Sequence, residues 1–395
     1  MPEKPRLGVA GVPTDIAAVE LIARNLGVAL VYLVDGQGAR PPVPENAEVV
    51  QISLDDMDKE VPRFQGLDLR GVWLVECRYQ RWLNQMAPHF AWPHLNCAVD
   101  HPDRPCPIPN ARSFSADGLA RLVESGSGTI PIPSWVRSSC GNGDSSCMRV
   151  EHPSDLSLAI QKLRKRSPEG VLRIQPTVEG DIYRLLAFKT GRTLVPVDLV
   201  EEIVTPSVYR VPLGVSMPVA RRGALFDETV RQAREVSDVL PTGWGMVQME
   251  FVISAESGDI ILTDVQAPAG LDQDLQTVFL LSQGIDLTRC AMECALGHHP
   301  SVAPTCETGI AFSWLLTRSG VVVGFEGVEA APELPGVVAI HINAHEGDIL
   351  THVVDMPTRE RGGYIVTRGA TAAIARERLE VVRNAAWIST SPALS

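Results

Sequence analysis

Several features that mark familiar protein classes are missing from this chain of 395 residues. No run approaches the ~18 consecutive apolar residues that a membrane-spanning helix needs. Segment 1–11 lacks the long apolar core of a secretory signal peptide. The eight cysteines include no CxxC pair, which argues against a zinc site. We therefore expect reduced thiols, a cytoplasmic location and no membrane partner.

An excess of positive charge is also missing. The chain has 35 Lys and Arg against 47 Asp and Glu, which gives a formal net charge of −12. This balance argues against a nucleic acid or an anionic membrane as partner, so any phosphate site must come from a local basic cluster. The apolar content of 45% and the charged content of 21% are ordinary for globular proteins. The length suits two or three domains.

Two β-strands joined by a turn are predicted within residues 243–270, because two apolar runs flank the turn sequence Ser257-Gly258-Asp259. Each strand carries one acid, Glu250 on the first and Asp264 on the second. Facing carboxylates repel each other unless a cation lies between them. Oxygen ligands on rigid strands suit Mg²⁺, which takes one or two carboxylates and completes its shell with phosphate oxygens. The alternative is a hairpin with both acids at a solvent-exposed rim.

The first 110 residues alternate between apolar runs and helical periodicity. Runs at 6–10, 29–34 and 71–76, with a helical pattern at 15–25, predict an open parallel sheet. The glycines of this region lack the full GxGxxG pattern, so no dinucleotide site is expected. Residues 88–109, rich in proline, histidine and tryptophan, predict a loop or linker that closes this domain.

A segment of small residues follows at 138–146, between predicted strands at 133–137 and 147–150. Arg137 ends the first of these strands. Such a loop can wrap its backbone N–H groups around phosphate oxygens while Arg137 supplies charge. The alternative is a solvated hairpin loop with Arg137 at its base.

The second half of the chain mixes an antiparallel meander with helices. A helix is predicted at 155–166, strands lie between 171 and 202, and a loop spans 207–222. Arg184 in this meander either lines an acceptor site or pairs with Asp181 or Glu179. Further helices are predicted at 226–240, 271–284, 285–296 and 370–387, and a β-rich segment begins at residue 309.

Taken in order, these elements resemble an ATP-grasp ligase. The resemblance rests on the N-terminal βαβ pattern, the strand and small-residue loop, a QxxxEG-type turn beginning at Gln175, and the helix leading to the paired acidic strands. ELPGV at 333–337 and RGGYIVTRGAT at 361–371 resemble the C-terminal lobe of the bacilysin-type L-amino-acid ligases. The implied fold class is α/β, with α+β grasp domains and a β-rich C-terminal lobe.

The resemblance also implies domain bounds and an activity. The expected domains are an N-terminal pre-ATP-grasp domain at 1–110, a small grasp subdomain at 111–180, a metal and catalytic subdomain at 181–303 and a ligase-like lobe at 304–395. The implied activity is that of an ATP-dependent enzyme that joins a small-molecule carboxylate and an amine through an acyl phosphate, forming an amide or peptide bond. Its cofactors would be ATP and Mg²⁺, with Mn²⁺ as an alternative, and a homodimer is left open.

Site residues follow from the resemblance position by position. Glu250 resembles the first metal acid, Asp264 stands at the second and Gln266 completes the metal site. Gln175 to Glu179 resembles the hinge that takes adenine and ribose. Arg137 stands where a lysine reaches the α-phosphate, and the loop residues that would cradle phosphate are Ser139, Gly141 and Gly143.

The sequence departs from the family pattern at three places. Asp-x-Gln at 264–266 replaces the usual Glu-x-Asn, and Arg137 replaces a lysine of different shape. Residues 267–270 lack the arginine that commonly follows, so the candidates for that catalytic role are Arg210, Arg221 and Arg222. These departures motivate an alternative function, a catalytically degenerate ATP-grasp protein that binds a nucleotide or metabolite without ligation.

Overall fold

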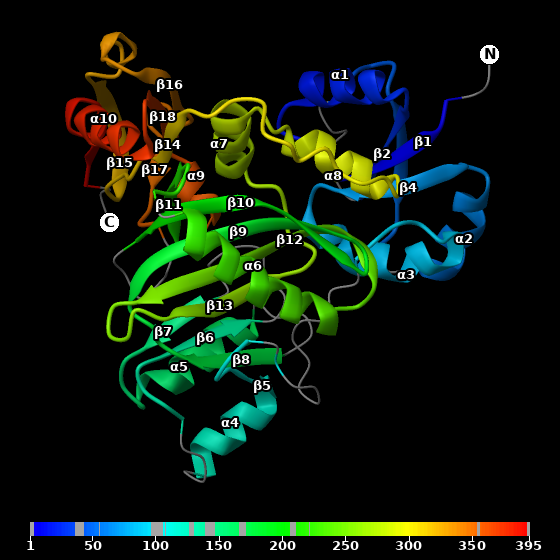
Figure 1. Ribbon diagram of the computed structural model, residues 1–395, viewed down its shortest axis with the longest axis horizontal. Helices are drawn as coiled ribbons and strands as arrows, with labels where there is room; N and C mark the ends of the chain where they lie inside the picture. Colours follow the sequence, from blue (N-terminus) through cyan, green and yellow to red (C-terminus); the bar gives the residue numbers. More distant parts are fainter. Residues whose placement is uncertain are drawn as a thin grey trace.

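The computed structural model describes residues 4–35, 43–54, 56–95, 106, 108–125, 130–138, 147–165, 171–205, 211–220, 222–353 and 356–392. Four sheets account for its strands. Figure 1 shows an eight-stranded sheet at the centre, with a four-stranded sheet below it and the N-terminal and C-terminal segments at its two ends. The N-terminal sheet is parallel and the other sheets are antiparallel in their described pairings, so the predicted α/β class is confirmed.

The N-terminal sheet has the strand order β3-β2-β1-β4. Its helices bury apolar side chains against it, and Trp82 and Trp92 pack around Phe64. The loop predicted from residue 88 is wrong in its first part, because α3 continues through Pro88 to Phe90. Burial of Trp82 and its neighbours on this helix outweighs the hydrogen bond that proline cannot make. The elements are β1 (Arg6–Ala10), α1 (Ile16–Leu26), β2 (Ala29–Asp35), β3 (Glu48–Ile52), α2 (Met57–Gln65), β4 (Leu69–Leu74), η1 (Cys77–Tyr79) and α3 (Gln80–Phe90).

A four-stranded antiparallel sheet of order β5-β8-β6-β7 follows. Helices α4 and α5 cover one face of this sheet through a cluster that includes Leu119, Val136 and Ile160. Because side chains alternate along a strand, the other face carries Arg137 and Arg173. The elements are β5 (Arg112–Ser115), α4 (Ala116–Ser125), β6 (Ser134–Ser138), β7 (Cys147–Val150), α5 (Asp155–Arg164) and β8 (Val171–Pro176).

The eight-stranded sheet has the order β13-β12-β9-β10-β11-β14-β18-β16. Helix α6 packs on one face and helices α7 and α8 pack on the other, each over its own apolar cluster. The loop predicted at 207–222 is wrong where β11 forms, since Pro212–Met217 is a buried strand between β10 and β14. The elements are β9 (Gly180–Gly191), β10 (Thr193–Val204), β11 (Pro212–Met217), α6 (Arg222–Val239), β12 (Gly243–Ser254), β13 (Ile260–Gln266), α7 (Gln273–Gln283) and α8 (Leu287–Ala295).

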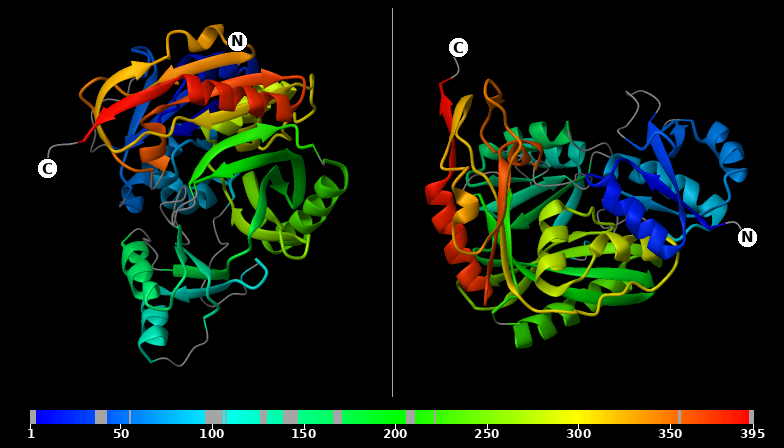
Figure 2. Two further views of the ribbon diagram at one scale, coloured as in Figure 1. Left: turned by 90° about the vertical axis from the view of Figure 1, so that its left-hand side faces the viewer. Right: turned by 90° about the horizontal axis from the view of Figure 1, so that it is seen from above.

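The C-terminal segment contributes three strands to the eight-stranded sheet and three to a small sheet of order β17-β15-β19. Helix α10 packs against β14 and β18. Figure 2 shows the N-terminal sheet and the C-terminal segment at opposite ends of the molecule. No helix in the described part of the chain has the length and apolar character needed to cross a bilayer. The elements are β14 (Gly309–Trp314), β15 (Gly320–Glu326), η3 (Ala331–Glu333), β16 (Val337–Ile342), β17 (Ile349–Leu350), α9 (Met356–Glu360), β18 (Gly363–Gly369), α10 (Ala372–Ala385) and β19 (Trp387–Ser391).

Candidate functional site

The two predicted acids lie side by side on β12 and β13. Glu250 and Asp264 are direct partners in the antiparallel register, which shifts just after Glu250. The side chains of both acids are 12% exposed, so the alternative of a solvent-exposed rim is wrong. The Thr263 hydroxyl donates a hydrogen bond to the Glu250 carboxylate, which fixes its orientation. The hairpin therefore presents two inward carboxylates.

Two arginines from the four-stranded sheet reach these carboxylates. Arg137 donates from Nη1 to Asp264 Oδ2 at 3.1 Å and from Nη2 to Glu250 Oε1 at 3.4 Å. Arg173 donates from Nη2 to the other oxygen of Asp264. Arg137 on β6 and Arg173 on β8 are direct register partners, so their side chains share one face of that sheet. The site thus joins the β5-β8-β6-β7 sheet to the eight-stranded sheet by buried ion pairs.

These arginines set the ionisation of Asp264. Burial alone disfavours the charged carboxylate, but the adjacent guanidinium groups of Arg137 and Arg173 outweigh it and hold the pKa of Asp264 well below its usual range. Asp264 is therefore a carboxylate at neutral pH. An ionised acid at this position can ligate a metal or balance the charge of an arginine.

The two carboxylates are the kind of ligand that Mg²⁺ prefers, but Arg137 also binds them. Glu250 and Asp264 supply hard oxygen ligands on adjacent strands, and Mg²⁺ accepts one or two carboxylates plus phosphate oxygens. In this structure Arg137 holds one oxygen of each acid. No group of three or more His, Cys, Asp or Glu within the described ranges is arranged to hold a metal. Glu250 and Asp264 alone would leave most of the coordination positions of a metal to other ligands, such as phosphate oxygens or water.

The remaining predicted site residues are only partly described. Gln175 is buried on β8 beside Trp135 of β6, two residues from Arg173 on the same strand face. Glu179 is exposed in the turn after β8, and Arg149 pairs with it at 2.7 Å. Gln266 on β13 is the register partner of Gln248. Arg222 begins α6. The predicted residues that lie outside the described residues are Ser139, Gly141, Gly143, Arg210 and Arg221.

Arg184 belongs to a second charged group beside the first. Arg184 on β9 is the register partner of Glu250 on β12. Its guanidinium donates to Gln248 at 3.2 Å and to Glu202, and it lies 3.5 Å from Asp272. The predicted alternative in which Arg184 pairs with Asp181 or Glu179 is therefore wrong. Arg184 pairs instead with Glu202 and Asp272.

Asp272 is the partly exposed acid of this second group, just before α7. Burial, together with the neighbouring carboxylate of Asp274, raises the pKa of Asp272 to about 6 despite the opposing charge of Arg184. Its side chain is 30% exposed, so it can exchange a proton with solvent near neutral pH. Sequence reasoning missed Asp272 and Arg173. The only available signal for Arg173 was a basic residue in the apolar run VLRIQ.

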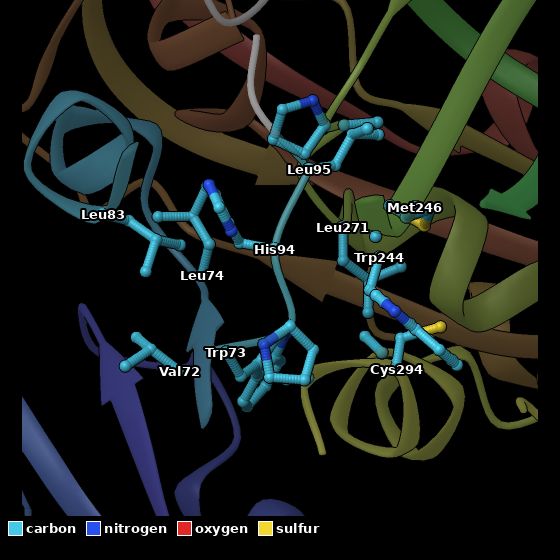
Figure 3. Close-up of a pocket in the computed structure, with 16 residues that line it drawn as sticks. Val72, Trp73, Leu74, Leu83, His94, Leu95, Trp244, Met246, Leu271 and Cys294 are labelled. Atoms are coloured by element: carbon cyan, nitrogen blue, oxygen red, sulfur yellow. The ribbon is translucent and has the colours of Figure 1, made fainter. Parts of the chain in front are cut away.

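A small apolar cavity of about 50 Å³ lies nearby, between the N-terminal sheet and the large sheet (Figure 3). The backbone N–H of Trp244 donates to the carbonyl of His94 at 3.0 Å, and both residues line this cavity. Its volume admits a few water molecules or a small apolar group, and a nucleotide does not fit. The lining residues labelled in Figure 3 are Val72, Trp73, Leu74, Leu83, His94, Leu95, Trp244, Met246, Leu271 and Cys294.

Comparison with known proteins agrees with this architecture. A family model described as L-amino acid ligase C-terminal domain 2 matches residues 313–391. The L-amino acid ligase from Bacillus licheniformis has a TM-score of 0.79 at 13% identity, covering 99% of this chain and 100% of that one. Phosphoribosylglycinamide synthetase from Anaerococcus prevotii has a TM-score of 0.65 at 14% identity, covering 98% and 100%. No match was found among curated protein sequences.

A third similar structure is N5-carboxyaminoimidazole ribonucleotide synthetase from Thermotoga maritima, with a TM-score of 0.64 at 12% identity, covering 98% of this chain and 100% of that one. At such identities the likeness establishes the fold, and activity must be argued from the site. The chain has the ATP-grasp fold that these structures share. The resemblance to ATP-grasp ligases, and to L-amino-acid ligases in the C-terminal segment, is confirmed.

Proposed function

We propose that this chain is an ATP-dependent carboxylate–amine ligase that forms an amide or peptide bond between small molecules. The observation that carries the proposal is the pair of buried carboxylates, Glu250 and Asp264, faced by Arg137 and Arg173 across two sheets of an ATP-grasp fold. Opposite charges brought together in this way can bind a metal–nucleotide complex, whose phosphates are anionic and whose metal is cationic. The matched L-amino acid ligase segment supports amino acids as the substrate class.

In the proposed reaction, a substrate carboxylate oxygen attacks the γ-phosphorus of ATP. The bond to the β–γ bridging oxygen breaks, and ADP and an acyl phosphate are formed. An amine then attacks the acyl carbon, the C–O bond to phosphate breaks, and the amine proton passes to solvent or to a base. Bound Mg²⁺ or Mn²⁺ would supply charge neutralisation at the phosphates.

The chain's own residues would take separate roles in this reaction. Glu250, Asp264 and Gln266 would hold the metal, while Thr263 and Arg173 keep the two carboxylates oriented. Arg137 would bind phosphate oxygens through its planar guanidinium. Further phosphate contacts would come from Ser139, Gly141 and Gly143, the adenine and ribose contacts from Gln175 and Glu179, and the catalytic cation from Arg210, Arg221 or Arg222.

We keep the predicted domain bounds of 1–110, 111–180, 181–303 and 304–395 as part of this proposal. A cytoplasmic enzyme acting on small carboxylates and amines fits the charge of the chain, and a homodimer is left open. The absence of an arginine in residues 267–270 favours one second candidate, a nucleotide or metabolite binder without ligase activity.

The test is to incubate the intact chain with MgATP and pairs of amino acids, and to measure ADP, phosphate and product. The proposal expects ADP release only when both a carboxylate and an amine are present, with one ADP for each bond formed. Glu250→Gln should abolish this turnover, and exposed Glu256→Gln should leave it unchanged. ATP turnover that ignores both substrates would contradict ligase activity, and nucleotide binding without turnover would favour the second candidate.

A further inference from the structure

Arg137 occupies the position between two carboxylates where a bridging cation would act. One nitrogen of its guanidinium group contacts Asp264 at 3.1 Å and another contacts Glu250 at 3.4 Å. The Arg137 side chain is only 8% exposed, so these contacts lie out of bulk solvent. A cation between facing carboxylates relieves their repulsion. Arg137 already supplies that relief without a metal.

A divalent ion would compete with Arg137 for the same oxygens. Arg137 holds Asp264 Oδ2 and Glu250 Oε1, one oxygen of each carboxylate that would hold an ion. The two arginines and the two acids sum to zero charge. An ion arriving alone would add positive charge to this group and would displace the buried Arg137 guanidinium from both carboxylates, which is unfavourable.

We propose that Arg137 is an exchangeable counter-ion that makes divalent metal binding at Glu250 and Asp264 conditional on the nucleotide. This inference rests on the proposed function, because it takes the ligand to be a nucleotide. Nucleotide phosphates offer Arg137 a new anionic partner, so its guanidinium leaves the two carboxylates and their negative charge becomes available to the metal. The phosphates also add the negative charge that an incoming ion needs nearby.

Arg173 is the fixed member of the arginine pair. It is more deeply buried than Arg137, with a side chain 3% exposed, and it binds the Asp264 oxygen that Arg137 does not. After Arg137 leaves, Arg173 still holds Asp264 in place and Thr263 still holds Glu250. Arg173 is thus a positioning residue for the metal site, and Arg137 is the residue that changes partners.

The experiment measures Mn²⁺ binding to the intact chain, by calorimetry and by the electron paramagnetic resonance signal of free Mn²⁺. Titrations are made with and without ADP on the wild type, Arg137→Gln and Arg137→Gln/Glu250→Gln. The control is Arg164→Gln, which removes an exposed arginine of the same four-stranded unit that pairs with Asp117 on α4. None of these measurements depends on turnover.

We expect wild type and Arg164→Gln to bind Mn²⁺ weakly without ADP and at least tenfold more tightly with it. Arg137→Gln should bind Mn²⁺ without ADP more tightly than wild type, by on the order of tenfold to a hundredfold. The double variant should lose that gain. Equal Mn²⁺ affinity of ADP-free wild type and Arg137→Gln would overturn the proposal, and so would a gain that persists in the double variant.

Arg137→Lys provides a second test if Arg137→Gln does not fold. Lysine keeps the charge but lacks the fork that reaches two carboxylates at once, so an intermediate gain in ADP-free Mn²⁺ affinity is expected. An unchanged affinity in folded Arg137→Lys would count against the counter-ion role. Failure of the proposed function looks different, because wild type would then bind no ADP with or without Mn²⁺, while the Mn²⁺ gain of Arg137→Gln would remain.

Discussion

Arg173 and Asp264 form a buried ion pair although they are 91 residues apart in the chain. One belongs to the four-stranded sheet and the other to the edge strand of the eight-stranded sheet. Because Asp264 also contacts Arg137, a single carboxylate carries two links between the sheets. The stability of this fold and the charge of the candidate site therefore depend on the same group.

The first prediction concerns acid stability. The pKa of Asp264 is lowered in the folded chain, so its stabilising effect is complete above the unfolded value near pH 4 and fades as the pH falls below it. Asp264→Asn should therefore lower the free energy of unfolding at pH 7 by about 1–3 kcal/mol, since two arginines lose their buried anion. The gap between wild type and variant should narrow from pH 4 to pH 2.5, as measured by urea unfolding. A difference in free energy of unfolding that stays constant from pH 4 to pH 2.5 would contradict this prediction.

The second prediction concerns Asp272, whose pKa is raised to about 6 mainly by burial. A raised carboxyl pKa means that the folded chain binds a proton more tightly than the unfolded chain, so stability falls as the pH rises from about 4 to about 6. Asp272→Asn should therefore raise the free energy of unfolding at pH 7.5 by about 1–2 kcal/mol, a figure reduced to allow for the exposed part of the side chain. A higher melting temperature at this pH would report the gain.

The same substitution should have little effect at pH 4.5, where Asp272 is already mostly protonated. Asp259→Asn, in the exposed turn between β12 and β13, is the matched control and should be neutral at both pH values. Stabilisation by Asp272→Asn that is equal at pH 4.5 and pH 7.5 would show that proton binding is not the cause.

Periodicity predicted the elements that depend on local sequence. The hairpin carrying Glu250 and Asp264 follows from two apolar runs and the turn at Gly258, where the positive φ of 76° suits glycine. The strand at 6–10 was predicted with its observed bounds. These features were accessible because alternation and turn residues act within a few positions of each other.

Contacts between distant segments could not be predicted in the same way. The local sequence of Arg173 indicates only a strand residue. Its partner Asp264 becomes apparent only when the fold brings β8 and β13 together. The local sequence of β11, which begins at Pro212, indicated a loop. The strand forms because it pairs with β10 on one side and with β14 on the other. The roles of the candidate site residues stay predictions.

The third prediction concerns Arg359, which is 1% exposed on α9. Its guanidinium donates to the Pro212 carbonyl at 2.9 Å, lies 3.6 Å from Asp274 and stacks 4.7 Å from the centre of the Trp314 ring. Arg359→Met should destabilise the fold by about 3–5 kcal/mol, because Asp274 is left as a buried charge without this partner.

Urea unfolding of Arg359→Met, Asp274→Asn and the double variant measures this coupling. The double variant should lose less stability than the sum of the single variants, because the second substitution removes a charge that the first left uncompensated. Arg361→Met, at an exposed position two residues away, should change stability little. Additive effects of the two single substitutions would rule out a direct interaction between Arg359 and Asp274.

The fourth prediction concerns the packing of the N-terminal sheet on α8. A Cβ atom at Gly71 in the middle of β4 would lie 1.8 Å from the carbonyl oxygen of Ala295, so Gly71→Ala must push β4 and α8 apart. Helix α8 also packs on β12, the strand that carries Glu250. Overpacking against backbone should lower the free energy of unfolding by about 1–3 kcal/mol.

Gly66→Ala is the matched control in the same sheet unit, since Gly66 has a negative φ and its added Cβ would have only one neighbour, 4.0 Å away. If the N-terminal sheet forms one wall of the substrate site, Gly71→Ala should raise the KM of the carboxylate or amine substrate. The Kd of ADP should stay unchanged, because the β12 residues that share a cavity with α8 are Trp244 to Met246, at the start of the strand and several residues before Glu250. A change in ADP affinity with unchanged substrate KM would place this contact on the nucleotide side of the site instead.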